Sequence, residues 1–395
     1  MSPPSAKRRT AIRFIVCLGF VSLFADMTYE GAYSITGPFL KGLGASAVQV
    51  GFIAGFGEMI AASLRFFSGR LADRTRAYWP IVTLGYVLNL LAIPALAFVG
   101  SWQAATLLIV LERTGKSLRG PARDVLLSEA TGDVGHGWGF GLHGAMDQIG
   151  AVIGPLIMVA AVAHWKRFGP AFLPLAIPAA MALGSLAVAR SVHPRRGAPP
   201  PPPIPASNRL PQVFWIYAAA AGLLACGFID FPLLAFHLQT VQVVKPEMIP
   251  LLYAGAMGTS GASALLFGRL FDRHGIVVLA AGILISLLSL PLGFLGGPAS
   301  VVVGVACWAI GLGAQDASLR AGIAQVVSMD KRGGAFGAFN GVYGVMWFGG
   351  SVVMGLLYGR SLIALVTFGV VAQLLAAAVF FWLRQRLTGG GRQAT

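Results

Sequence analysis

The feature that most constrains this sequence is a series of long apolar segments, each near the length that a membrane-spanning helix needs. About 20 mainly apolar residues cross the hydrocarbon core of a bilayer, and only helices or closed barrels satisfy their backbone groups there. These segments are too long and too evenly apolar for barrel strands. We therefore expect an all-α polytopic membrane protein with twelve spans, at residues 12–37, 46–69, 79–99, 103–125, 138–163, 168–190, 212–238, 247–268, 276–296, 299–323, 334–358 and 361–384.

Composition and charge agree with a membrane protein. The 395 residues are 56% hydrophobic and 11% charged, whereas soluble domains carry about a quarter charged residues. The net charge of +15 could indicate nucleic-acid binding, but 22 of the 29 Lys and Arg residues fall on one side of the twelve spans. This is the positive-inside pattern. We expect an integral protein of the plasma (inner) membrane with both termini cytoplasmic and no nucleic-acid partner.

Cysteines and the first residues exclude several other classes. Cys17, Cys226 and Cys307 are dispersed within apolar segments, so they predict neither a disulfide framework nor a metal site. We expect no cofactor. The first apolar segment continues through Asp26 and Glu30 without a small-residue cleavage site, which predicts a first span and no removable signal peptide.

Two halves of the chain repeat each other across a proline-rich linker. The linker, residues 192–211, favours an extended conformation, and it separates six expected spans in 1–191 from six in 212–395. "GRLADR" (69–74) matches "GRLFDR" (268–273), "FAD" (24–26) matches "FID" (228–230), and "SLR" occurs at 117–119 and 318–320. Matches in the same order at nearly constant offset indicate a duplicated six-helix unit.

These features together resemble the major facilitator superfamily of secondary transporters. The resemblance implies two pseudo-symmetric six-helix bundles, a small-molecule substrate, and a central cavity lined by spans one, four, seven and ten. It implies gating at the repeated loops, where Asp73 would meet the start of span eleven near Gly333 and Gly334, and Asp272 would meet span five near Gly137. We expect a monomer. The residues of the gating motif are Gly69, Asp73, Arg74, Gly268, Asp272 and Arg273.

Ionisable residues inside the spans are the functional candidates, because charge at bilayer depth is costly. Asp26 and Glu30 lie four apart on one face of the first span, and His143 and Asp147 have the same spacing in the fifth, which suits a proton relay. Structural roles remain open, as a water-reaching helix end or a fixed ion pair. The candidates for binding substrate or protons are Asp26, Glu30, Tyr33, Glu58, Arg113, His143, Asp147, Asp230 and Asp316.

The fourth span has the densest charge of any span. Glu112 and Lys116 are spaced to pair along the helix, which leaves Arg113 in need of an anion from elsewhere. The family resemblance implies a functional arginine on this span, and Arg113 is the matching residue. A fixed salt bridge to the first or fifth span is the structural alternative.

The fifth span carries a glycine pattern suited to close helix packing. Gly141, Gly150, Gly154 and Pro155 fit G-x8-G-x3-G-P; small residues let helices approach, and Gly-Pro permits a bend. In the family that the chain resembles, this pattern is typical of exporters that work by antiport.

The acid-rich spans favour proton carriage, a cationic substrate, or both. We expect a proton-coupled exporter of a small organic compound that works by alternating access, with protons, the substrate and the lipid bilayer as its partners. Alternatives are an importer of a small metabolite, an exporter of divalent cations using carboxylates with His143 and His237, and a sensor or lipid scramblase. An enzyme is not expected, because the sequence has no H-E-x-x-H or Cys/His cluster, and no G-x4-G-K-[ST] loop indicates an ATP-driven pump.

Overall fold

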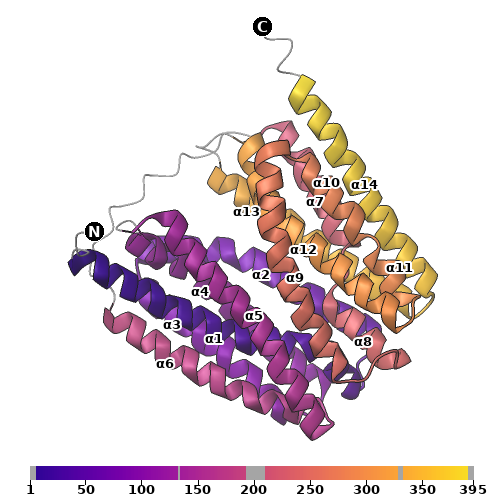
Figure 1. The fold of residues 1–395 in the computed structure, drawn as a ribbon, viewed down its shortest axis with the longest axis horizontal. Helices are drawn as coiled ribbons and strands as arrows, with labels where there is room; N and C mark the ends of the chain where they lie inside the picture. The colour runs from indigo at the N-terminus through magenta and orange to yellow at the C-terminus, as the bar shows by residue number, and fades with distance from the viewer. Residues whose placement is uncertain (1–5, 132–133, 193–209, 328–331, 390–395) are drawn as a thin grey trace. The chain divides into compact units, whose positions relative to one another are not determined.

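All regular structure in the described chain is helical (Figure 1). The computed structural model describes residues 6–131, 134–192, 210–327 and 332–389. Within these ranges there is no strand, which confirms the all-α prediction. The helices are α1 (Ala6–Gly42), α2 (Ala47–Thr75), α3 (Tyr78–Ala95), η1 (Leu96–Phe98), α4 (Trp102–Thr131), α5 (His136–Trp165), η2 (Pro170–Leu175), α6 (Ala176–Val192), α7 (Gln212–Gly227), α8 (Phe231–Val241), α9 (Met248–His274), α10 (Val277–Ser286), α11 (Ser289–Phe294), α12 (Pro298–Val326), α13 (Arg332–Tyr358) and α14 (Leu362–Gly389).

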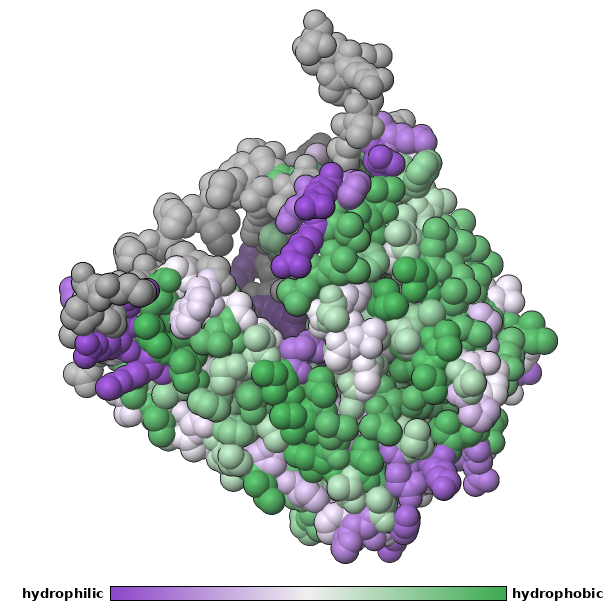
Figure 2. Space-filling view, viewed as in Figure 1, coloured by the Kyte–Doolittle hydropathy of each residue, from purple (hydrophilic) through white to green (hydrophobic). Residues whose placement is uncertain are grey.

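The helices are long and apolar, as a membrane requires. In the described ranges, eleven helical segments are long and apolar enough to cross a bilayer, with α7–α8 and α10–α11 each counted as one. Large apolar side chains on several of these segments face outward: Leu265 is 71% exposed and Ile363 68%. Figure 2 shows hydrophobic residues over most of the visible surface, with hydrophilic residues gathered toward helix ends. These faces suit contact with lipid.

Helix α4 is the twelfth expected span and does not satisfy the same test of length and apolarity. Its 30 residues make it about 45 Å long, which exceeds the ~30 Å hydrocarbon core. Its charged residues, from Glu112 to Glu129, lower its hydropathy. Several of those side chains are buried within the protein, and burial against other helices is how charge is tolerated at membrane depth. In the part of the chain that the structure describes, eleven segments qualify as spans by apolarity, and α4 is an additional long helix.

The chain forms two compact units that exchange short segments. The N-terminal unit contains residues 1–44, 64–203 and 246–254, and the C-terminal unit contains 45–63, 204–245 and 255–395. In the N-terminal unit α1 packs against α5 and α6, and α3 packs against α4. In the C-terminal unit α7 packs against α13 and α14, and α10 packs against α12. The boundaries expected from the sequence stay a prediction, and most of the linker, 193–209, lies outside the described residues.

Close packing of α1 on α5 depends on two of the three motif glycines. A Cβ at Gly154 would overlap the carbonyl oxygen of Met27, and one at Gly150 would overlap that of Leu23. A Cβ at Gly141 would meet no atom within 4 Å. The backbones of α1 and α5 therefore touch at Gly150 and Gly154, which holds the polar face of α1 directly against α5.

The seventh expected span is broken into α7 and α8 at residues 228–230. Pro232 lies in the first turn of α8, and a proline removes a backbone donor and disfavours an unbroken helix. The carbonyl groups freed by the break have side-chain partners: Gln373 Nε2 donates to Gly227 O at 2.8 Å, and Trp308 Nε1 donates to Ile229 O at 2.9 Å. The sequence pattern predicted one continuous span here, because the partners that permit the break come from distant helices.

Candidate functional site

The polar face of α1 lies against a row of cations on α4. On α1 the row is Ser22, Asp26, Tyr29, Glu30 and Tyr33, and on α4 it is Arg113, Lys116, Arg119 and Arg123. Spacings of three and four residues keep each row on one helix face. The contacts that join the rows are Ser22 Oγ with Arg123 Nη1 (3.2 Å), the Tyr29 ring with Lys116 Nζ (3.8 Å to the centroid), Glu30 Oε1 with Lys116 Nζ (3.6 Å) and the Tyr33 ring with Arg113 Cζ (5.0 Å to the centroid). Together they define an antiparallel register between α1 and α4.

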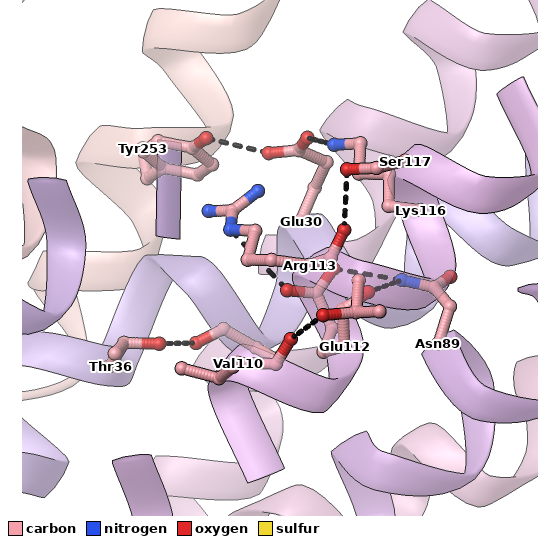
Figure 3. Close-up of polar contacts among 11 residues, drawn as sticks. Glu30, Thr36, Asn89, Val110, Glu112, Arg113, Lys116, Ser117 and Tyr253 are labelled. Atoms are coloured by element: carbon pink, nitrogen blue, oxygen red, sulfur yellow. Dashed lines mark hydrogen bonds and ion pairs between the residues drawn. The ribbon is translucent and has the colours of Figure 1, made fainter. Parts of the chain in front are cut away.

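Glu30 is the most heavily contacted acid of this face (Figure 3). It forms the ion pair with Lys116 and accepts a hydrogen bond of 2.6 Å from Tyr253 Oη. Tyr253 belongs to the 246–254 segment at the start of α9, and its ring packs on Tyr33 with centroids 5.7 Å apart. A short O–H···O⁻ bond is a strong, charge-assisted contact. Glu30 therefore helps to hold this segment of α9 against the N-terminal unit.

Arg113 and Glu112 form a second buried group next to Glu30 (Figure 3). Arg113 Nε lies 3.4 Å from Glu112 Oε2, and Asn89 Nδ2 on α3 donates to Glu112 Oε1 at 2.8 Å. The sequence spacing indicated that Glu112 can pair with Lys116. In the structure Lys116 pairs with Glu30 instead, because the register of α1 on α4 brings that carboxylate within reach.

Asp147 and His143 of α5 approach the same face of α1. By the predicted topology they lie on the cytoplasmic side of Glu30 and Arg113. His143 Nε2 lies 3.7 Å from Asp147 Oδ1 and 3.0 Å from Ser22 Oγ, so the predicted pair is in proximity. Ser22 in turn accepts from Arg123, which pairs with Asp124 at 2.9 Å. His143 is buried, whereas the side chain of Asp147 is 30% exposed.

Asp26 is buried at 7% exposure and forms no hydrogen bond or ion pair with any part of the chain that the structure describes. It nevertheless lies among charges. Asp147, Lys116, Glu30 and Arg119 all interact with it electrostatically. Asp26 is one of the acids predicted from the sequence to bind substrate or protons.

Sequence reasoning missed Arg119, which is one of the 22 basic residues that the positive-inside pattern places on the cytoplasmic side. Its side chain is 2% exposed, and its guanidinium lies 4.2 Å from the centre of the Tyr86 ring and 5.7 Å from that of Tyr29. Such cation–π contacts partly replace water. In the described chain it makes no ion pair, and its Nε has no hydrogen-bond partner. The signal that could have identified it is its helical spacing from Arg113 and Lys116.

In the C-terminal unit, Asp230 differs from its repeat counterpart Asp26. It occupies the position just before α8 without a side-chain capping bond, and its carboxylate accepts hydrogen bonds from Trp347 Nε1, at 2.8 Å, and from Ser351 Oγ, both on α13. Asp26 has no such donors in the described ranges. Of the other predicted residues, Glu58 is half-buried on α2 and Asp316 is exposed on α12. The two units thus use equivalent acids in different ways.

The gating motif is described only in part. The surroundings of Asp73, Gly137 and Gly333 lie outside what the structure describes, so the gate contacts stay predictions. Gly69 and Gly268 lie near the small side chains of Pro121 and Ala317. Arg74, Asp272 and Arg273 are exposed at the ends of α2 and α9.

The cluster in the N-terminal unit can bind small charged groups and exchange protons, because it holds several acids and bases within reach of one another. No group of three His, Cys, Asp or Glu side chains in the described ranges is placed to hold a metal ion.

Known proteins resemble this chain in sequence and in fold. The sequence profile of the Major Facilitator Superfamily matches residues 16–351. An uncharacterised protein of Mycobacterium tuberculosis (strain ATCC 25618 / H37Rv) is 37% identical over 383 residues, covering 95% of this chain and 94% of that protein. Multidrug resistance protein MdtH of Photorhabdus laumondii is 31% identical over 143 residues, 36% of this chain and 33% of that protein.

Solved structures show the same fold at low sequence identity. A point mutant of the nucleoside transporter NupG superposes with a TM-score of 0.75 at 14% identity, covering 94% of this chain and 99% of that one. A point mutant of the peptide transporter POT gives a TM-score of 0.75 at 15% identity, covering 98% of this chain and 99% of that one.

Proposed function

Because the chain belongs to the major facilitator superfamily, we propose that it exports a small organic compound in exchange for protons. Membership and fold establish a membrane transporter that works by alternating access on a small-molecule substrate. The direction of transport, the coupling ion and the class of substrate are the proposed part, together with residence in the plasma (inner) membrane and cytoplasmic termini.

The observation that carries proton coupling is Asp26. A buried carboxylate without a hydrogen-bond or ion-pair partner in the described chain is costly, and taking up a proton removes the charge that causes this cost. Asp147 and Glu30 add negative charge nearby, which increases the benefit of protonation. Asp147 is also partly exposed, so it offers a route by which protons reach Asp26.

Export is supported by the contact of α5 with α1. The glycine pattern resembles that of antiporting exporters in the family, and Gly150 and Gly154 bring α5 directly against the turn of α1 that carries Asp26. A change in the charge of Asp26 therefore acts at a close helix–helix contact. The similarity to multidrug resistance proteins over part of the chain supports the same direction.

The gating motif completes the proposed cycle. Asp73 would stabilise the start of span eleven when the cytoplasmic side is closed, because a helix N-terminus favours an anion. Asp272 would do the same at span five. Release of these contacts would open the transporter to the cytoplasm and so admit the substrate.

Everted membrane vesicles test the direction of transport. Respiration acidifies the lumen of such vesicles and quenches acridine orange, and compounds are then added on the cytoplasmic face. A panel of organic cations, zwitterions, organic anions and neutral compounds is compared between vesicles with and without the protein.

Antiport predicts that at least one compound restores fluorescence only when the protein is present, because substrate entry releases lumenal protons. A proton-coupled importer would give no such recovery on this face. Uptake of a labelled compound without fluorescence recovery would contradict the proposal.

A further inference from the structure

Most of the charges between α1, α4 and α5 are paired. The ion pairs are Arg113 with Glu112, Lys116 with Glu30 and Arg123 with Asp124, and the partly exposed Asp147 lies 3.7 Å from His143. Two deeply buried charged side chains of this cluster remain, Asp26 and Arg119. Neither has an ion pair or a hydrogen bond in the described chain, and both are more than nine-tenths buried.

The register of α1 on α4 places these two side chains at the same level. Asp26 lies one turn from Ser22, which contacts Arg123, and one turn from Glu30, which contacts Lys116. Arg119 lies between Arg123 and Lys116 on α4. The two charges interact electrostatically but are farther apart than the 4.0 Å of an ion pair.

Asp26 and Arg119 each pack closely against a different helix. The guanidinium of Arg119 lies 4.2 Å from the centre of the Tyr86 ring, and a Cβ at Gly85 would collide with the Cβ of Arg119, so the start of this side chain is confined between α3 and α4. The Cβ of Asp26 packs closely against Gly150 of α5. A buried acid and a buried base that are not in contact each lack half of a polar interaction.

We propose that the substrate is a small zwitterion, whose ammonium group binds Asp26 and whose carboxylate or other anionic group binds Arg119. This deepens the proposed function and rests on it for the direction of transport. A single molecule with both charges supplies an oppositely charged partner to Asp26 and to Arg119 at once. A compound with one charge supplies a partner to only one of these side chains.

The same arrangement accounts for exchange with protons. An ammonium group and a proton compete for Asp26, so each excludes the other, as antiport requires. The charged groups that face Asp26 are Glu30 on its own helix, Lys116 and Arg119 on α4, and Asp147 on α5. Arg119 keeps its charge throughout the cycle, so it retains the anionic end while Asp26 decides between substrate and proton.

The test uses matched compounds that differ only in charge. Thermal stabilisation of the purified full chain is measured with the protein amino acids that have uncharged side chains, γ-aminobutyrate and aminomethylphosphonate. Each carboxylic acid is set beside its amide, which keeps only the positive charge, and each compound is set beside its deaminated acid, which keeps only the negative charge. At least one zwitterion is expected to bind about tenfold or more tightly than both analogues, as one lost charge-assisted contact would give.

Two variants assign the ends of the molecule. In Arg119→Gln the amide should bind as tightly as its zwitterion. In Asp26→Asn the deaminated acid should bind as tightly as its zwitterion. A variant that fails to fold loses all binding, so a change of preference cannot arise from misfolding, and Arg119→Lys should restore part of the preference for the zwitterion. If no zwitterion in the panel binds, if a single-charge analogue binds the wild-type protein equally well, or if Arg119→Gln keeps the zwitterion preference, the proposal is overturned.

These outcomes separate this inference from the proposed function. Zwitterions that bind but cause no proton movement in everted vesicles would leave the substrate class standing and contradict antiport. Amides that drive proton movement as well as zwitterions would leave antiport standing and overturn the substrate class.

Discussion

The hydroxyl group of Tyr253 provides a direct test of a single contact in the site. It donates to Glu30 at 2.6 Å, and interhelical hydrogen bonds in membranes contribute about 0.6–2 kcal/mol. We expect Tyr253→Phe to lower the free energy of unfolding by an amount in that range, measured by denaturant unfolding in detergent.

Tyr86 supplies the matched control for this substitution. Its hydroxyl is buried without a hydrogen-bond partner in the described chain, so Tyr86→Phe removes an unsatisfied group and should leave stability unchanged or slightly increased. Equal losses from both substitutions would show that the Tyr253–Glu30 bond contributes nothing specific.

At the scale of helices, the contact between α1 and α5 determines whether the site can assemble. Gly154→Ala places a Cβ against the Met27 carbonyl oxygen, and overpacking of this kind costs about 1–3 kcal/mol. We expect a lower midpoint of thermal unfolding and weaker substrate binding, because the displaced α1 carries Asp26 with it.

Gly141 is the control, since a Cβ there meets no atom within 4 Å and alanine is favoured over glycine in a helix by about 0.5–1 kcal/mol. Gly141→Ala should therefore be neutral or stabilising. A loss as large as that of Gly154→Ala would mean that glycine matters along the whole motif for some reason other than helix contact.

Helices could be predicted from the sequence far better than the contacts between them. Long apolar segments predict where the helices lie. The spacing of Asp26 from Glu30, and of His143 from Asp147, predicts that each pair shares one helix face. The break before Asp230 was missed, since its stabilising donors come from helices remote in the sequence. Tyr253 was missed for the same reason.

For the molecule as a whole, the positive-inside pattern concealed the burial of one charge, Arg119. The pattern predicts a cytoplasmic position for Arg119, because basic residues near span ends usually reflect topology. Its burial against Tyr86 depends on the packing of α3 on α4, where Gly85 and Gly115 allow close approach, and no periodicity within α4 alone reveals that contact. Charge counts thus predict the orientation of a transporter, while the site depends on which of those charges become buried.

In the proposed antiport, Asp26 is the buried acid that couples the movement of protons to the movement of substrate. Asp26 and the exposed Asp124, which pairs with Arg123, are suitable for comparison because each loses one carboxylate on conversion to Asn. The measurement is made in proteoliposomes that contain only the purified protein, with pyranine trapped inside and an acidic lumen.

The compound with the largest response in the vesicle panel is added outside in radiolabelled form, and its uptake and the lumenal pH are recorded together. We predict that wild-type protein and Asp124→Asn take up the compound while the lumen becomes more alkaline, and that Asp26→Asn causes no compound-dependent change in pH. Equal proton movement through Asp26→Asn, or uptake by the wild-type protein with no change in lumenal pH, would contradict proton-coupled exchange at Asp26.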